Sequence, residues 1–162
     1  MILLHNIGEK INSNYNTLEE ILACDEPISF DGVYRNVYEN WDQIKHKDVT
    51  LFVMGDYIGK DNSFDKGQKL EKLCTLSEIL EMGRDGARLG WHSWSHRDLT
   101  TLTDDEIRSE LIAPVMFKRY LAYPYGKFNG RVIDMVKEAM FQEAWSVTDG
   151  DNSQFQMVRR YL

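Results

Sequence analysis

Cysteine is scarce in this chain of 162 residues, and the two that occur, Cys24 and Cys74, are far apart. They form no C-x-x-C pair, so by themselves they cannot build a zinc knuckle or a thioredoxin-type redox pair. A disulfide between them is conceivable, but two free thiols in a reducing compartment are the simpler interpretation. Any metal site in this chain therefore needs other residues.

Positive charge is also in short supply, because 19 Lys and Arg stand against 26 Asp and Glu and give a net charge of −7. General binding to nucleic acid needs a basic surface that neutralises phosphates, so we expect no nucleic-acid partner. Long hydrophobic runs are missing, and the opening MILLHNIGEK lacks the basic start of a signal peptide. We therefore expect no membrane partner and a cytoplasmic location.

The chain has no internal repeat, low-complexity segment or linker, and 43% of its residues are apolar. This is enough apolar material for a packed core, and 162 residues suit one domain better than two. We expect a single domain over 1–162, whose oligomeric state the sequence leaves open.

Predicted strands and helices alternate along the chain. The strands are expected at 2–5, 27–30, 49–55, 87–92, 119–123 and 143–147, and the helices at 14–23, 33–45, 73–86, 102–112 and 129–140. Such alternation is typical of an α/β protein with a mainly parallel sheet, either open or curled into a barrel. Asp31, His92 and Pro124-Tyr125 each follow the C-terminal end of a predicted strand, which is the edge where α/β proteins bind ligands.

Two of the four histidines, His92 and His96, are four residues apart in GWHSWSHRDL. Side chains at this spacing lie on one face of a helical turn, so the two imidazoles can hold one metal ion, and zinc suits them. The pair is not the HExxH arrangement of zinc proteases, because Ser93 follows His92. The alternative is that both rings pack against tryptophan and bond to the backbone.

The stretch DGARLGWHSWSHRDLTTLTDDEIRSEL resembles the polysaccharide deacetylase family, the metal-dependent carbohydrate esterases of chitooligosaccharide-deacetylase type, whose second motif is H-[ST]-x-x-H. ISFDGVYRNVYENW is similar to the family's first motif, T-F-D-D-G, and LAYPYGKFN to its motif ending in Pro-Tyr-Gly. WSVTDG and the opening ILLHNIG also match, so the resemblance covers nearly the whole chain. It implies a distorted, incomplete (β/α) barrel with mainly parallel strands.

The resemblance also implies a reaction, the metal-dependent hydrolysis of acetyl groups on an N-acetylated, or O-acetylated, sugar or polysaccharide precursor. His92 and His96 match the metal-binding histidines, and the metal is most often zinc. Asp31 matches the general base, and the amide of Tyr125 matches the donor to the oxyanion. Trp145 falls where the family places a hydrophobic pocket residue.

Substrate contacts are expected from Trp94, Pro124, Tyr125 and Trp145. Aromatic faces suit the apolar side of pyranose rings, although core packing is an equally good explanation for Trp94 and Trp145.

The first motif departs from the family pattern. Aligned without a gap, Gly32 replaces the metal-binding aspartate and Asp31 is the base or a substitute ligand. With a one-residue gap, Asp31 would be the ligand and the base would be lost. We prefer the ungapped alignment, and either way one carboxylate is missing. The alternative for Asp31 is to cap the following helix.

Two further departures concern groups that act on the base and on the leaving amine. The family often has an arginine just before Pro-Tyr, where this chain has Ala122 and Tyr123. The family's last motif, with its leucine and histidine, lies beyond Leu162, so we expect the usual general acid to be absent. His5, at the end of the first predicted strand, is a candidate substitute, although a structural role is the alternative. A catalytically impaired carbohydrate-binding or regulatory relative is therefore the second functional hypothesis.

Overall fold

The computed structural model describes residues 1–8, 15–147 and 149–162. They form two compact units. Unit 1 consists of Met1–Leu51, Tyr57–Arg88 and Tyr161–Leu162, and unit 2 consists of Phe52–Asp56 and Leu89–Arg160. Two predictions extend beyond the described residues. The first predicted helix includes residue 14, and the matched stretch WSVTDG includes residue 148. The prediction of one domain over 1–162 stays a prediction.

The strands β1 and β4 of unit 1 are parallel and buried. β1 (Ile2–Leu4) pairs with β4 (Ile28–Asp31), and β5 (Val49–Val53) follows β4 in the order of the sheet. β2 (Asn6–Ile7) and β3 (Tyr15–Asn16) form a second, short parallel pair. Every residue of β1 and β4 is buried, as expected for a parallel sheet covered on both faces.

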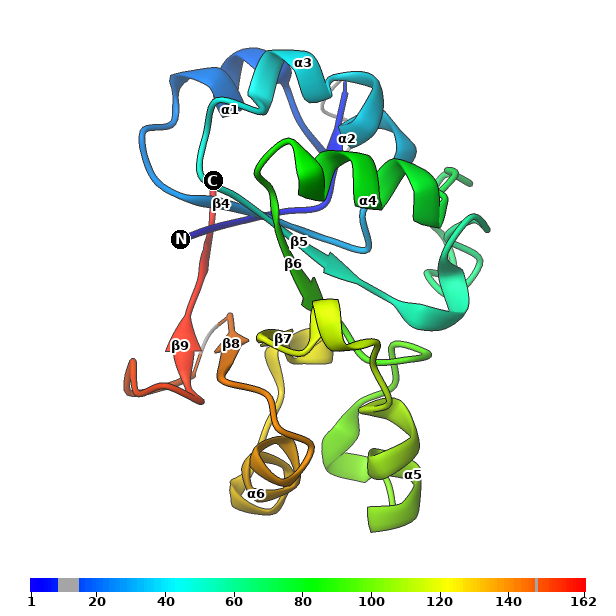
Figure 1. Cartoon of the computed structure of the whole chain (residues 1–162), viewed down its shortest axis with the longest axis vertical. Coiled ribbons are helices and arrows are strands. Elements are labelled where there is room, and N and C mark those ends of the chain that lie inside the picture. Colours follow the sequence, from blue (N-terminus) through cyan, green and yellow to red (C-terminus); the bar gives the residue numbers. More distant parts are fainter. Residues whose placement is uncertain (9–14, 148) are drawn as a thin grey trace. The chain divides into compact units, whose positions relative to one another are not determined.

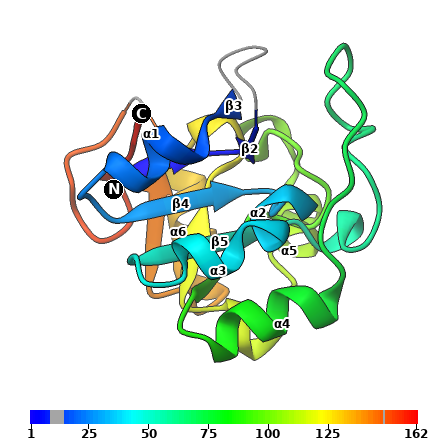
Figure 2. The same ribbon diagram turned by 90° about the horizontal axis from the view of Figure 1, so that it is seen from above.

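The helices of unit 1 are short. They are α1 (Leu18–Ala23), α2 (Arg35–Glu39), α3 (Trp41–Ile44) and α4 (Leu76–Arg84). Two of them, α1 and α4, begin with a complete capping box, from Thr17 with Glu20 and from Thr75 with Glu78. Figure 2 shows α4 running alongside α2 and α3, where Tyr38 donates a hydrogen bond of 2.9 Å to Glu81.

The single helix predicted over 33–45 is wrong, because α2 and α3 are separate. Val33 lies before the helix with φ of +50°, and Asn40 interrupts it with φ of −104° and ψ of 8°. The side-chain amide of Asn40 donates a 2.8 Å hydrogen bond to the carbonyl of Asn36. Asparagine competes in this way with the main-chain bonds of a helix, and the apolar spacing gave no sign of it.

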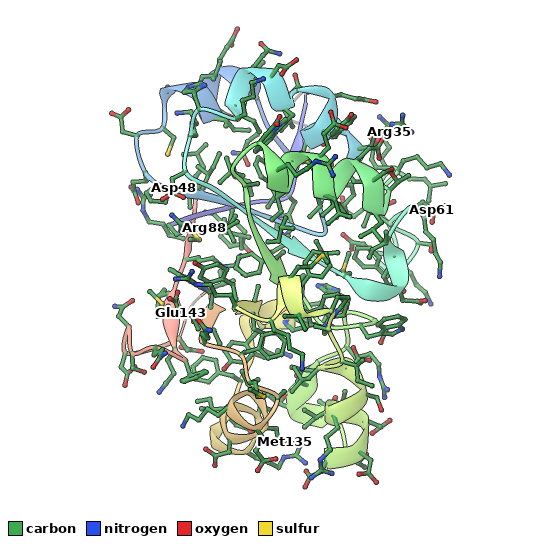
Figure 3. All side chains as sticks on the ribbon, viewed as in Figure 1. Arg35, Asp48, Asp61, Arg88, Met135 and Glu143 are labelled. Carbon is green, nitrogen blue, oxygen red and sulfur yellow. The ribbon has the colours of Figure 1, made fainter. Side chains whose placement is uncertain are left out.

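Arg88 and Asp48 mark the starts of two neighbouring segments of unit 1. Asp48 directly precedes β5, and Arg88 is the first residue of β6 (Arg88–Trp91). Their side chains form an ion pair, and Figure 3 labels the two close together. The pair joins these two residues within unit 1.

The strands of unit 2 are also parallel. β5 and β6 are followed in the sheet by β7 (Tyr120–Ala122), β8 (Glu143–Ser146) and β9 (Met157–Val158), and the pairs β6–β7, β7–β8 and β8–β9 all run parallel. β10 (Arg160–Tyr161) ends the chain's strands and spans the boundary between the units. The predicted α/β class with mainly parallel strands is confirmed.

Two α-helices of unit 2 lie next to each other, α5 (Asp104–Glu110) and α6 (Gly130–Glu138) (Figure 1). Thr103 begins α5 with a complete capping box, and the side chain of Asn129 caps α6. Four 3₁₀ turns occur among the described residues: η1 (Gly55–Tyr57), η2 (Leu99–Thr101), η3 (Val115–Phe117) and η4 (Pro124–Gly126). None of the helices in the described part of the chain is long and apolar enough to cross a membrane.

Candidate functional site

His92 follows β6 directly and is only 3% exposed. Its amide donates to the carbonyl of Val53 at 2.8 Å, which continues the pairing of β5 with β6. Its ring atom Nδ1 lies 2.8 Å from the carbonyl oxygen of Ala122, at the end of β7. A carbonyl only accepts hydrogen bonds, so Nδ1 carries the proton and the lone pair of the neutral ring is at Nε2.

His96 does not lie on a helical turn with His92, and that part of the sequence interpretation is wrong. The segment between them is irregular, with φ of +64° at Ser93 and +60° at His96. The hydroxyl Oγ of Ser93 accepts the amide of His96 at 2.9 Å and closes the turn. The structure still brings the two imidazoles together, with ring centres 4.8 Å apart and planes tilted by 60°.

The distance between the two ring centres is the one expected for two imidazoles that bind the same metal ion. Two imidazoles that bind one tetrahedral zinc ion, each with a nitrogen about 2 Å from it, have ring centres about 5 Å apart. The tautomer of His92 also fits, because metal-binding histidines usually donate their other ring N–H to a carbonyl or carboxylate. The pair is thus suited to provide two neutral nitrogen ligands to a divalent ion.

The Pro-Tyr-Gly turn, η4, lies beside His96. Tyr125 adopts a left-handed conformation with φ of 59°, and its ring centre is 4.7 Å from that of His96. Tyr125 is 61% exposed, whereas Pro124 is buried. The amides of Gly126 and Lys127 close the turn onto Tyr123 and Pro124, so the amide of Tyr125 is not used in closing it.

Gly126 and Lys127 fix the position of this turn. Gly126 has φ of +69°, and a Cβ atom there would come within 2.9 Å of the amide nitrogen of Val147. Lys127 forms a 2.8 Å ion pair with Asp98, the residue that caps η2. Partial burial alone would raise the pKa of Asp98, but hydrogen bonds from Lys127 and Thr100 hold it below its ordinary value. Asp98 therefore stays charged and anchors the turn at neutral pH.

The two tryptophans of the histidine segment differ in exposure. Trp94 is 44% exposed, while Trp91 is buried and its ring centre lies 6.2 Å from that of Trp94. Trp145, in β8, is only 8% exposed, and its indole Nε1 has no hydrogen-bond partner within residues 1–8, 15–147 and 149–162. Trp94 is therefore open to a ligand, and Trp145 is a largely buried residue with an unused donor.

Glu110 is a polar residue of this region that the sequence analysis missed. It is 4% exposed and ends α5, and its carboxylate accepts hydrogen bonds from the amide of Ser95 at 2.8 Å and from the hydroxyl of Ser95. The available signal was its position: it follows Ile107 by three residues and precedes Leu111, and both of these are buried. A glutamate on the apolar face of an amphipathic helix indicates a specific partner.

Asp31 and His5 belong to unit 1. Asp31 is the last residue of β4 and 5% exposed, and it is followed by Gly32 with φ of 88° and Val33 with φ of 50°. The alternative role of Asp31 as a helix cap is wrong, because α2 has Tyr34 at its N-cap and no side-chain cap. The ring of His5 stacks on that of Tyr161, with centres 6.3 Å apart. The catalytic roles of Asp31 and His5 stay predictions.

Within the described residues, no group of three or more His, Cys, Asp and Glu side chains is placed to hold a metal ion. Both cysteines are free thiols, and burial raises the pKa of Cys74 to about 12. The candidate site in unit 2 therefore consists of the histidine pair, the Tyr125 turn and Trp94.

Comparison with known proteins gives a consistent result. The family model described as polysaccharide deacetylase matches residues 25–144. A peptidoglycan-N-acetylmuramic acid deacetylase of Bacillus subtilis is 30% identical over 160 residues, which is 89% of this chain and 54% of the relative. The chain spans about half or less of the length of the curated relatives that it matches.

Solved structures that resemble this chain over 99% of its length include two deacetylases. A Streptococcus pyogenes deacetylase in complex with acetate has a TM-score of 0.70 at 14% identity and matches 99% of this chain and 89% of its own. A polysaccharide deacetylase of Bacillus cereus has a TM-score of 0.72 at 17% identity, over 99% of this chain and 63% of its own. At these identities the likeness establishes the fold, and it confirms the fold class implied by the sequence motifs.

Proposed function

The chain belongs to the polysaccharide deacetylase family, and we propose that it hydrolyses acetyl groups on an N-acetylated, or O-acetylated, sugar or polysaccharide precursor. The reaction adds water to an acetyl amide or ester and releases acetate together with the free amine or hydroxyl. We further propose that it depends on a divalent metal, with zinc as the first candidate. The names of the relatives support this substrate class, since one is a deacetylase of N-acetylmuramic acid in peptidoglycan.

The observation that carries the proposal is the arrangement of His92 and His96. With Nδ1 of His92 bonded to the carbonyl of Ala122, Nε2 is the proposed ligand atom, and the ring separation of 4.8 Å suits one shared ion. Two neutral ligands bind a dication more weakly than a set that includes a carboxylate. The replacement of the family's second aspartate by Gly32 therefore predicts modest metal affinity.

The remaining roles are assigned to the chain's own side chains and amides. When bound, a divalent metal supplies polarisation of the acetyl carbonyl and eases ionisation of the attacking water. Asp31 takes a proton from that water, or serves as third ligand if the gapped alignment holds. The amide of Tyr125 donates to the developing oxyanion, and His5 is the proposed donor to the leaving amine.

Substrate binding is assigned to the exposed rings beside the histidines. Trp94 and Tyr125 are 44% and 61% exposed and offer flat apolar faces to a pyranose ring. Pro124 shapes the turn that presents Tyr125, and Trp145 is assigned to the pocket for the acetyl methyl group. These assignments predict that longer oligosaccharides bind more tightly than a single sugar.

A second candidate function is a catalytically impaired relative that binds carbohydrate or regulates another enzyme. Gly32 in the first motif favours it, together with the finding that the described residues contain no group of three metal-ligating side chains. Such a protein would bind sugar without binding metal or releasing acetate.

The two functions are distinguished by metal content after gentle purification and by acetate release from N-acetylglucosamine oligomers with added zinc or cobalt. We expect acetate release that His96→Gln lowers at least a hundredfold. His46→Gln is the matched control, because His46 is exposed and lies just after α3. Sugar binding with neither metal nor acetate release would contradict the enzyme and favour the binding module.

A further inference from the structure

The carboxylate of Glu110 lies in an environment that disfavours negative charge. Glu110 is the last residue of α5 and only 4% exposed. Burial disfavours a charged group, and the C-terminal end of a helix carries partial negative charge that repels a carboxylate. A residue in such a position needs partners that offset both effects, and those partners indicate its role.

Four hydrogen bonds reach Glu110 from the segment that carries the histidines. Its main-chain carbonyl accepts the indole N–H of Trp91 and the amide of Trp94, each at 3.0 Å. Its carboxylate accepts the amide of Ser95 through Oε2 at 2.8 Å and the hydroxyl of Ser95 through Oε1. Both carboxylate oxygens are therefore committed to one residue, the neighbour of His96.

This segment needs support from outside itself. Between Trp91 and His96 the backbone forms neither helix nor strand, and Ser93 and His96 adopt left-handed conformations that cost free energy. The amides of Gly55 and Asp56 bind the carbonyls of Ser93 and Trp94, which fixes the first half of the loop. Glu110 fixes the second half.

We propose that Glu110 is a positioning residue of the metal site. By accepting from the amide and the hydroxyl of Ser95, it fixes the residue that precedes His96, while the hydroxyl of Ser93 accepts from the amide of His96. The imidazole of His96 is thereby kept opposite that of His92. Glu110 acts through Ser95 and touches neither metal nor substrate, and its role in metal affinity rests on the proposed function.

The first test is Glu110→Gln, which keeps the size of the side chain but removes its negative charge and turns one of its two acceptor oxygens into an NH₂ group, so the charge-assisted bonds to Ser95 are lost. In the metal-free protein we expect hydrogen exchange of the Ser95 amide to become at least tenfold faster. Zinc affinity measured by calorimetry should fall about 10- to 100-fold, the range typical for groups that support metal ligands.

Ser95→Ala is the second variant. It removes the hydroxyl contact and keeps the amide contact, so its effect on zinc affinity should be smaller than that of Glu110→Gln. The fold-loss of zinc affinity in the double variant should be smaller than the product of the fold-losses in the two single variants, because both substitutions act through the same contact. Independent, multiplying losses would show that Glu110 does not act through Ser95.

Asp105→Asn is the matched control, because it removes one negative charge from the same helix at a side chain that is 97% exposed. It should change neither the exchange of the Ser95 amide nor the zinc affinity. If Glu110→Gln also leaves both unchanged while the wild-type protein binds zinc, the proposal is overturned and the proposed function stands. If the wild-type protein binds no zinc, the metal role fails for both, and exchange at Ser95 alone decides whether Glu110 holds the loop.

Discussion

The loops that follow β4 and β6 carry the two family motifs and are built differently. Each contains two residues with positive φ: Gly32 and Val33 after β4, Ser93 and His96 after β6. After β6, side chains hold the unusual backbone in place, through the hydroxyl of Ser93 and the carboxylate of Glu110. After β4, one of the left-handed residues is a fully buried valine, a β-branched side chain that strongly disfavours this conformation.

The comparison shows which of the two motifs still matches the family pattern in full. The second loop retains both histidines, together with the hydrogen bonds that orient His92 and hold the backbone at His96. The first loop retains one carboxylate, Asp31, and has Gly32 where the family pattern has a second. We therefore expect the loop after β6 to determine metal binding, and the loop after β4 to limit how tightly the metal is held and how fast the reaction proceeds.

The largest effect is expected from Asp31→Asn, which tests what the altered loop still contributes. Loss of a general base lowers the rate about 100- to 10,000-fold, and acetate release measures it. If Asp31 is the base, zinc affinity stays unchanged; if it is the third ligand, zinc affinity falls as well. Asp42→Asn, at an 88% exposed side chain of α3, serves as control. Full activity in Asp31→Asn would remove the first motif from the mechanism.

A moderate effect is expected from Gly55→Ala, which disturbs the packing beneath the loop after β6. A Cβ atom at Gly55 would lie 2.5 Å from ring atoms of both Trp91 and Trp94, so the rings must move. Overpacking of this kind lowers the free energy of unfolding by about 1–3 kcal/mol, measurable by urea denaturation. Gly130→Ala is the control, because nothing lies within 4 Å of a Cβ atom there. Equal stability of the two variants would show that the tryptophan packing is loose.

The smallest effect concerns the capping box of α5, the helix that carries Glu110. Hydrogen bonds from the amide of Thr103, and then from Arg97, lower the pKa of Glu106 from 4.5 to about 2. Because the pKa of Glu106 is lower in the folded state than its ordinary value, the ionised carboxylate stabilises the fold. Its contribution to the free energy of unfolding is complete above about pH 4.5 and is lost as the pH falls toward 2. The stability difference between wild type and Glu106→Gln should therefore shrink over that range, and a constant difference would contradict the assignment.

Much of the fold could be predicted because its signals are local. The capping boxes of α4 and α5 and the alternation of apolar strands with amphipathic helices are visible within a few residues of sequence. The division between α2 and α3 could not be predicted, because the apolar spacing continues through Asn40 while its side chain competes for the helix bond.

The candidate site was predicted in part, and the missing part is non-local. Motif spacing indicated that His92 and His96 lie together, and the rings are close. The reason given, a helical turn, was wrong, because the left-handed backbone at Ser93 depends on side-chain contacts that spacing does not encode. Glu110 lies 15 residues from its partner Ser95, and no pattern within the histidine segment indicates that contact.

We propose that His92 and His96 bind one divalent ion, His92 through Nε2. NMR of the histidine ring nitrogens during a zinc titration tests it directly. We expect Nδ1 of His92 to carry a proton before zinc is added, and the ring nitrogens of both histidines to shift together and saturate at one equivalent. Rings that shift at different zinc concentrations, or that do not respond, would contradict it.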